Sequence, residues 1–182
     1  ALAGDHGKFG FFCTEKEIYQ KIADELGIIR HSQSGAPLAY ARHPLVYLVE
    51  AADDICYEIM DIEDSHKLKI LSFEQTKDLL LGFFDESVKN SIEKRIKDEG
   101  ITDDNEKVIY MRACVIGKLE NVCARAFIDH EKEILDGTFK GCLIDHIPEP
   151  QRKAYKRCTE VSFNRIYKSK PVLDVELSGF KI

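Results

Sequence analysis

The chain has 182 residues, of which 32 are acidic and 26 are lysine or arginine, so its formal net charge is −6. Its hydrophobic content of 44% is enough for a folded core and excludes a disordered chain. The acidic balance gives no strong signal for nucleic-acid binding, which needs a basic surface. No apolar run approaches the roughly 18 residues of a membrane-spanning helix, so we expect no membrane association.

The cysteines and the first residues bear on the cellular compartment. Six cysteines are scattered along the chain without a Cys-x-x-Cys pair. This usage is typical of free thiols in a reducing compartment rather than of a disulfide framework or a zinc site. Residues 1–5 show neither the basic nor the apolar region of a secretory signal. The sequence therefore predicts a cytoplasmic protein.

Apolar periodicity and helix-terminating residues predict an all-α fold. Thr14 and Glu17 have the spacing of a capping box at a helix start, and Gly27 is suited to end that helix. Pro44 suits a first helical turn, and Ser72 suits an N-cap. Strand-like alternation is nearly absent. The predicted helices cover residues 15–26, 44–64, 73–84, 85–99, 102–135, 138–145 and 149–168, with a last helical piece from 171.

The predicted helix 44–64 divides into two faces at about 100° per residue. Its apolar face comprises Leu45, Leu48, Val49, Ala52, Ile55, Cys56, Ile59 and Ile62. Its other face carries Glu50, Asp53, Asp54, Tyr57, Asp61 and Asp64. Amphipathicity alone is typical of a surface helix whose apolar face packs on a core.

The charge of this helix indicates more than a surface role. Residues 44–64 contain seven carboxylates and no lysine or arginine. Like charges four residues apart destabilise a helix by a few tenths of a kcal/mol, and aspartate is a poor helix former. We therefore expect cations to offset this charge. They would be either a metal ion or lysine and arginine side chains from elsewhere in the fold.

The residues of this helix also carry a family resemblance. The run Glu50-Ala51-Ala52-Asp53-Asp54-Ile55-Cys56-Tyr57, followed by Asp61-Ile62-Glu63-Asp64, closely resembles the deoxyguanosinetriphosphate triphosphohydrolases of the HD phosphohydrolase superfamily. Segments 8–12 and 126–139 fit the same family in order, so the resemblance covers about residues 8–140. It implies that 1–182 is one helical segment of a larger HD-type domain. Residues 8–66 would contribute to the active site, and 67–182 would form a helical C-terminal part.

The resemblance also implies roles for individual residues. Asp53 matches the last ligand of a divalent metal ion, Mg²⁺ or Mn²⁺, whose other ligands would lie outside this chain. Tyr57 and Asp61 match residues that contact the deoxyribose and the phosphates. Lys8 resembles a lysine that reaches the triphosphate, where a flexible ammonium group suits a polyanion.

One part of the family pattern is missing. The resemblance implies a histidine and a His-Asp pair upstream of Asp53, but no His-Asp dipeptide occurs in this sequence. We therefore expect an internal segment of a longer hydrolase, inactive alone, because catalytic metal sites use three or more protein ligands. The complete enzyme would be a homo-oligomer that hydrolyses dGTP, or another dNTP, to the deoxynucleoside and tripolyphosphate. The alternative is a non-catalytic helical module that binds a nucleotide or a partner protein.

A few other residues could touch substrate but have a simpler interpretation. His43 precedes Pro44 at a predicted helix start, where a structural role is the favoured interpretation. Arg112, Lys118 and Arg125 could face phosphates, but their spacing selects none of them. We expect these three to be surface or packing residues.

Overall fold

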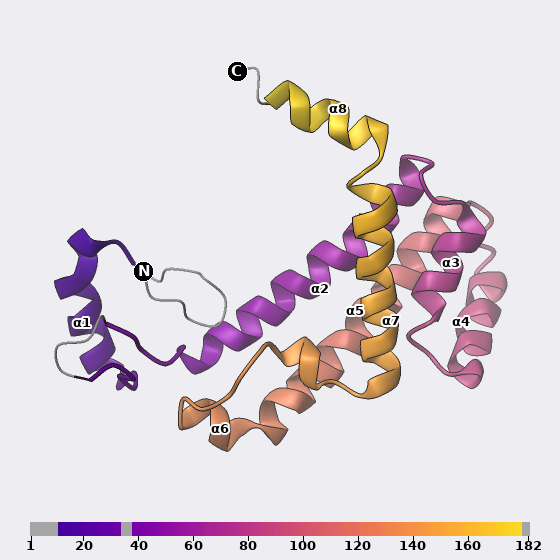
Figure 1. Ribbon diagram of the computed structural model, residues 1–182. Helices are drawn as coiled ribbons and strands as arrows, with labels where there is room; N and C mark the ends of the chain where they lie inside the picture. Colours follow the sequence, from indigo (N-terminus) through magenta and orange to yellow (C-terminus); the bar gives the residue numbers. More distant parts are fainter. Residues whose placement is uncertain (1–10, 34–37, 180–182) are drawn as a thin grey trace.

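The computed structural model describes residues 11–33 and 38–179 (Figure 1). Within these ranges the chain is helical apart from turns, loops and one isolated antiparallel bridge between Arg30 and Tyr40, so the all-α prediction is confirmed. The α-helices are α1 (Lys16–Glu25), α2 (Pro44–Lys67), α3 (Phe73–Leu81), α4 (Glu86–Asp98), α5 (Asp104–Asp129), α6 (Glu131–Leu135), α7 (Glu149–Val161) and α8 (Lys170–Gly179). Two 3-10 turns, η1 (Cys13–Glu15) and η2 (Leu143–His146), and one π-turn, η3 (Ser162–Ile166), complete the elements.

Local sequence signals explain most helix starts. Pro44 occupies the first turn of α2, and the Nδ1 atom of His43 accepts a hydrogen bond from the Leu45 backbone N–H at 3.2 Å. Ser72 forms a capping box with Gln75 at the start of α3. Each cap satisfies a backbone donor that has no partner inside its helix.

The capping role predicted for Thr14 is wrong. Thr14 lies inside η1, and α1 begins at Lys16. At the start of this turn, the Glu15 carboxylate accepts a hydrogen bond from the Phe12 backbone N–H at 2.9 Å. The 3-10 turn moves the helix start one residue along the chain, so that Glu15 rather than Thr14 occupies the N-cap position of α1.

The helices predicted at 102–135 and 138–145 also differ from the structure. The first is divided at His130, whose ring packs edge to face with the rings of Phe139 and His146 at centroid distances of 5.3 and 4.7 Å. Residues 138–142 form a loop, and 143–145 lie in the 3-10 turn η2 rather than in an α-helix. Gly137 and Gly141 have φ angles of +67° and +80°, and this left-handed conformation interrupts the helical pattern between α6 and η2.

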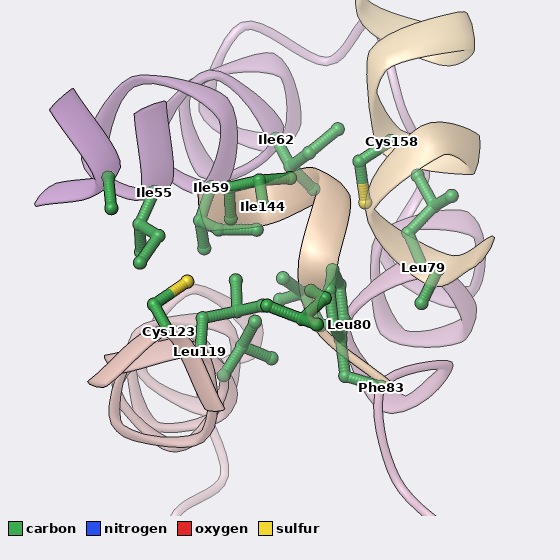
Figure 2. Close-up of a cluster of buried hydrophobic side chains, with 14 of the residues drawn as sticks. Ile55, Ile59, Ile62, Leu79, Leu80, Phe83, Leu119, Cys123, Ile144 and Cys158 are labelled. Atoms are coloured by element: carbon green, nitrogen blue, oxygen red, sulfur yellow. The ribbon is translucent and has the colours of Figure 1, made fainter. Parts of the chain in front are cut away.

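The hydrophobic core lies where α2 packs along α5, with α3, α7 and η2 closing the sides. Figure 2 shows Ile55, Ile59 and Ile62 of α2 facing Leu119 and Cys123 of α5. Burying one such aliphatic side chain contributes about 1.5–3 kcal/mol. In Figure 1, α1 and α8 lie apart from this bundle. No helix in the described part of the chain has the length and apolar character that crossing a membrane requires.

The apolar face predicted for α2 is correct only in its second half. Ile55, Ile59 and Ile62 are buried as expected, but Leu45 and Val49 are 58% and 69% exposed. The predicted members Leu48, Ala52 and Cys56 are exposed as well. The side chains that are buried are Tyr47, Ala51, Ile55, Glu58, Ile59, Ile62, Glu63 and Ser65. The buried face of α2 is therefore rotated from the predicted one, because α5 contacts the helix at Glu63 and α7 with η3 contacts it at Glu58.

The turn after α6 fits closely against the segment that leads into α2. Gly137 has a φ of +67°, and a Cβ atom there would lie 2.8 Å from the Ala41 Cβ and 3.2 Å from the His31 Nε2. Only glycine adopts this backbone conformation without strain, and only glycine leaves this space free.

Candidate active site

Helix α2 presents one solvent-exposed face that carries two of the predicted site residues. Asp53 and Tyr57 are exposed, Tyr57 at 68%, and Asp61 is half-buried. Residues four apart share a helix face, and eight residues span about 12 Å along the axis. Lys8, the fourth predicted site residue, lies outside the described residues.

Cations from the fold offset much of the charge on α2. The ion pairs are Arg42–Glu50 at 2.8 Å, Arg112–Glu63 and Lys67–Glu63 at 2.5 Å each, and Lys67–Asp64 at 3.4 Å. Arg42 precedes the helix, Arg112 comes from α5, and Lys67 belongs to the last turn of α2 itself. Of the two predicted sources of positive charge, lysine and arginine side chains are thus present for Glu50, Glu63 and Asp64.

Asp53 differs from these carboxylates. Within residues 11–33 and 38–179 its side chain has no hydrogen-bond or ion-pair partner. An exposed carboxylate is a ligand that Mg²⁺ and Mn²⁺ accept readily, so the residue fits the role of a single metal ligand. The described residues contain no group of three or more His, Cys, Asp or Glu side chains placed to hold a metal ion. The rest of such a site would have to come from other residues.

Asp61 is held by a residue that the sequence did not indicate. The Tyr167 hydroxyl, directly after η3, donates a hydrogen bond to the Asp61 Oδ2 at 2.5 Å. The hydrogen bond to Asp61, together with burial and negative charge, raises the pKa of Tyr167. Tyr167 therefore stays protonated and remains a donor to this carboxylate.

Glu58 is buried next to the same contact. Its two carboxylate oxygens accept hydrogen bonds from Thr159 of α7, at 2.9 Å, and from Ser162 of η3, at 2.7 Å. Burial raises the pKa of Glu58 above its ordinary value, while these two hydrogen bonds act in the opposite direction. No sequence signal points to Glu58, because its partners lie more than a hundred residues away and the period of the chain changes at η3.

A groove of about 510 Å³ lies between α2, η2 and α7. On its floor the Tyr155 hydroxyl donates to the Asp54 backbone carbonyl at 3.1 Å. Both signs of charge line it, because Asp54 and Glu58 lie across from Arg152 and Lys156. Burial, together with the Asp145 carboxylate, raises the pKa of Cys142 to about 12, so this thiol in the groove stays protonated. The lining is that of a polar groove without a reactive nucleophile.

The structural interpretation is confirmed for His43, Arg112 and Arg125, and Lys118 is half-buried on α5. His43 caps α2, and Arg112 pairs with the buried Glu63 carboxylate. Arg125 forms a surface ion pair with Asp129 at 3.3 Å.

Comparison with known proteins identifies related sequences over nearly the whole chain. No family model matches the sequence. A deoxyguanosinetriphosphate triphosphohydrolase-like protein of Pseudomonas aeruginosa is 32% identical over 171 residues, which cover 93% of this chain and 37% of the relative. One of the same description from Synechocystis sp. is 32% identical over 176 residues, 96% of this chain and 37% of the relative. The deoxyguanosinetriphosphate triphosphohydrolase of Salmonella typhimurium is 28% identical over 187 aligned residues, 96% of this chain and 35% of the relative.

These relatives confirm the resemblance predicted from the residues around Asp53. The chain spans a little over a third of the length of the curated relatives that it matches. Over almost all of its own length, this chain is homologous to one segment of proteins named deoxyguanosinetriphosphate triphosphohydrolase or deoxyguanosinetriphosphate triphosphohydrolase-like.

Proposed function

We propose that the protein carrying this chain is a metal-dependent deoxynucleoside triphosphate triphosphohydrolase. Its substrate would be dGTP or another dNTP, and its products the deoxynucleoside and tripolyphosphate. The printed names of the relatives support this reaction class. The arrangement of Asp53, Tyr57 and Asp61 along one side of α2 supports a shared site for metal and substrate.

The observation that carries the proposal is the contrast between Asp53 and the other acidic residues of α2. The fold supplies cations for Glu50, Glu63 and Asp64, and hydroxyl donors for Glu58 and Asp61. Asp53 has no such partner in the described part of the chain and is open to solvent. Asp53 is also the residue at which the family resemblance places a metal ligand.

In this proposal each residue has a separate task. The Asp53 carboxylate contributes one ligand to Mg²⁺ or Mn²⁺, and further ligands come from outside this chain, so the segment alone is inactive. When bound, the metal polarises a phosphoryl oxygen and activates water. The exposed Tyr57 ring packs against the deoxyribose, and Asp61 accepts a hydrogen bond from a sugar hydroxyl. Lys8 binds phosphate oxygens. The whole protein acts in the cytoplasm as a homo-oligomer.

The test is an assay of the natural protein that contains this chain, incubated with dGTP and Mg²⁺ or Mn²⁺. Release of tripolyphosphate, followed by ³¹P NMR, is the expected result. Asp53→Asn should lower the rate by at least about 100-fold, since even outer-sphere changes at metal sites cost 10–100-fold. Asp64→Asn is the matched control, because Asp64 is exposed on the same helix but pairs with Lys67.

Two results would contradict the proposal. Undiminished turnover by the Asp53→Asn protein would remove Asp53 from the metal site. Nucleotide binding without any turnover by the unaltered protein would favour the alternative function, a non-catalytic helical module.

A further inference from the structure

The π-turn η3 is fixed to α2 at both of its ends. At its first residue, the Ser162 hydroxyl donates to the Glu58 Oε1 at 2.7 Å. Directly after it, the Tyr167 hydroxyl donates to the Asp61 Oδ2 at 2.5 Å. The Tyr167 backbone N–H also donates to the Ser162 carbonyl at 3.0 Å, which closes an i→i+5 turn.

This geometry depends on the change of helical period. In an α-helix, residues three or four apart share a face, and residues five apart do not. An i→i+5 turn closes its hydrogen bond over one more residue than an α-helical turn does, which brings Ser162 and Tyr167 toward the same face. Glu58 and Asp61 are three residues apart on α2 and share a face there. Ser162 and Tyr167 can therefore reach Glu58 and Asp61 at the same time only when η3 keeps its π geometry.

Glu58 is the buried anchor of this arrangement. Both of its oxygens are occupied, because Thr159, on the last turn of α7, donates to the Oε2 at 2.9 Å. Glu58 is 8% exposed, and a carboxylate in such a place requires these donors. It therefore sets the position at which α7 changes into η3.

We propose that Glu58 is a positioning residue for the sugar end of the substrate site. It holds Ser162 and Thr159, which hold η3 in register, and η3 presents the Tyr167 hydroxyl to Asp61. The inference rests on the proposed function, because Asp61 is the residue to which sugar binding is assigned. It adds a role for a buried carboxylate that does not itself touch substrate.

The experiment compares variants of the natural protein in steady-state hydrolysis of dGTP and GTP. Glu58→Ala should raise KM for dGTP about tenfold, the effect of one lost hydrogen-bonded contact, with kcat changed less than about threefold. Preference for dGTP over GTP should fall with it. Glu58→Gln should restore KM, because an amide can accept from one hydroxyl and donate to the other. Ser162→Ala deletes one donor only and should show a smaller rise if Glu58→Ala fails to fold.

Glu63→Gln is the matched control, since Glu63 is equally buried on α2 but pairs with Arg112 and Lys67, away from η3. Its KM should stay at the value of the unaltered protein. Hydrogen exchange gives a second readout: amides of residues 162–167 should exchange faster in Glu58→Ala and not in Glu63→Gln.

The outcomes separate the two proposals. If the unaltered protein hydrolyses dGTP but Glu58→Ala and Ser162→Ala leave KM and sugar preference unchanged, the positioning role is overturned and the proposed function stands. If Glu63→Gln raises KM as much as Glu58→Ala does, the effect is one of general stability, which also overturns the positioning role. If the unaltered protein has no activity on any dNTP, the proposed function fails and this inference fails with it.

Discussion

Arg112 of α5 and Glu63 of α2 form an ion pair across the main helix interface, with the Arg112 Nη1 2.5 Å from the Glu63 Oε2. The Glu63 side chain is only 4% exposed, so its charge is largely removed from water. A buried carboxylate needs a cationic partner, and removal of that partner leaves an uncompensated negative charge in the core. The pair therefore links the helix that carries Asp53 to the longest helix of the bundle.

Replacing Arg112 by alanine should lower the free energy of unfolding by about 2 kcal/mol. The loss stays moderate because Lys67 remains 2.5 Å from Glu63. Urea unfolding of the natural protein measures it. Arg125→Ala is the control: that side chain is 75% exposed, and its pair with Asp129 should contribute less than about 0.5 kcal/mol. Equal losses in the two variants would show that the Arg112 pair is no more important than a surface pair.

Ile59→Ala should destabilise the protein by about 3 kcal/mol, because it opens a cavity at the centre of the α2–α5 interface. Ile59 is fully buried among the side chains shown in Figure 2. Thermal and urea unfolding both report the change. Leu68→Ala, at the exposed C-cap directly after the same helix, should alter stability by less than about 0.5 kcal/mol. A loss of stability in Ile59→Ala as small as that in Leu68→Ala would show that Ile59 does not lie in the core.

Tyr57 should contribute to sugar selectivity through its ring rather than through its hydroxyl. Under the proposed function, Tyr57→Ala should lower the preference for dGTP over GTP about tenfold, because space opens for a 2′-hydroxyl. Tyr57→Phe keeps the ring and should keep the preference. The ratio of kcat/KM for the two nucleotides is the quantity to measure. An unchanged ratio in the alanine variant would argue against contact between this ring and the sugar.

Glu58 should make stability depend on pH in a defined direction. Burial raises the pKa of this carboxyl in the folded protein above its ordinary value of 4.5, and the charge of Asp61 adds to the effect. A raised folded pKa means that its contribution is complete below the unfolded pKa and is lost as pH rises through the folded pKa. The difference in unfolding free energy between the unaltered protein and Glu58→Gln should therefore fall from pH 4 toward neutral pH. If this difference in unfolding free energy rose with pH instead, the pKa of Glu58 in the folded protein would be lowered and not raised.

The sequence predicted helix positions well where local chemistry decides them. Pro44 and Ser72 start helices in the structure as they do in the prediction, because capping depends on residues within one turn. The face of α2 was predicted less well. Periodicity alone ranks Val49 with Ile55, but neighbouring helices decide which of them is covered.

The candidate site likewise combines residues that one helix places together with residues that come from a distant part of the chain. Asp53, Tyr57 and Asp61 were predicted as site residues because they lie within a single helix and carry a family resemblance. Their placement in a working site stays a prediction. The partners of Asp61 and Glu58 come from beyond residue 158, where the chain leaves the α-helical period at η3. A periodicity analysis that assumes 3.6 residues per turn assigns Ser162 and Tyr167 to different faces.

The close approach of Gly137 to Ala41 means that the turn after α6 restricts the position of the chain that precedes α2. Any side chain at position 137 would displace Ala41 and His31, and Ala41 lies only three residues before Pro44, where α2 begins. The direction in which α2 leaves the bundle, and hence the placement of Asp53, is thus set partly by a residue that has no side chain. A single methyl group, added more than eighty positions away in the sequence, would be enough to shift it.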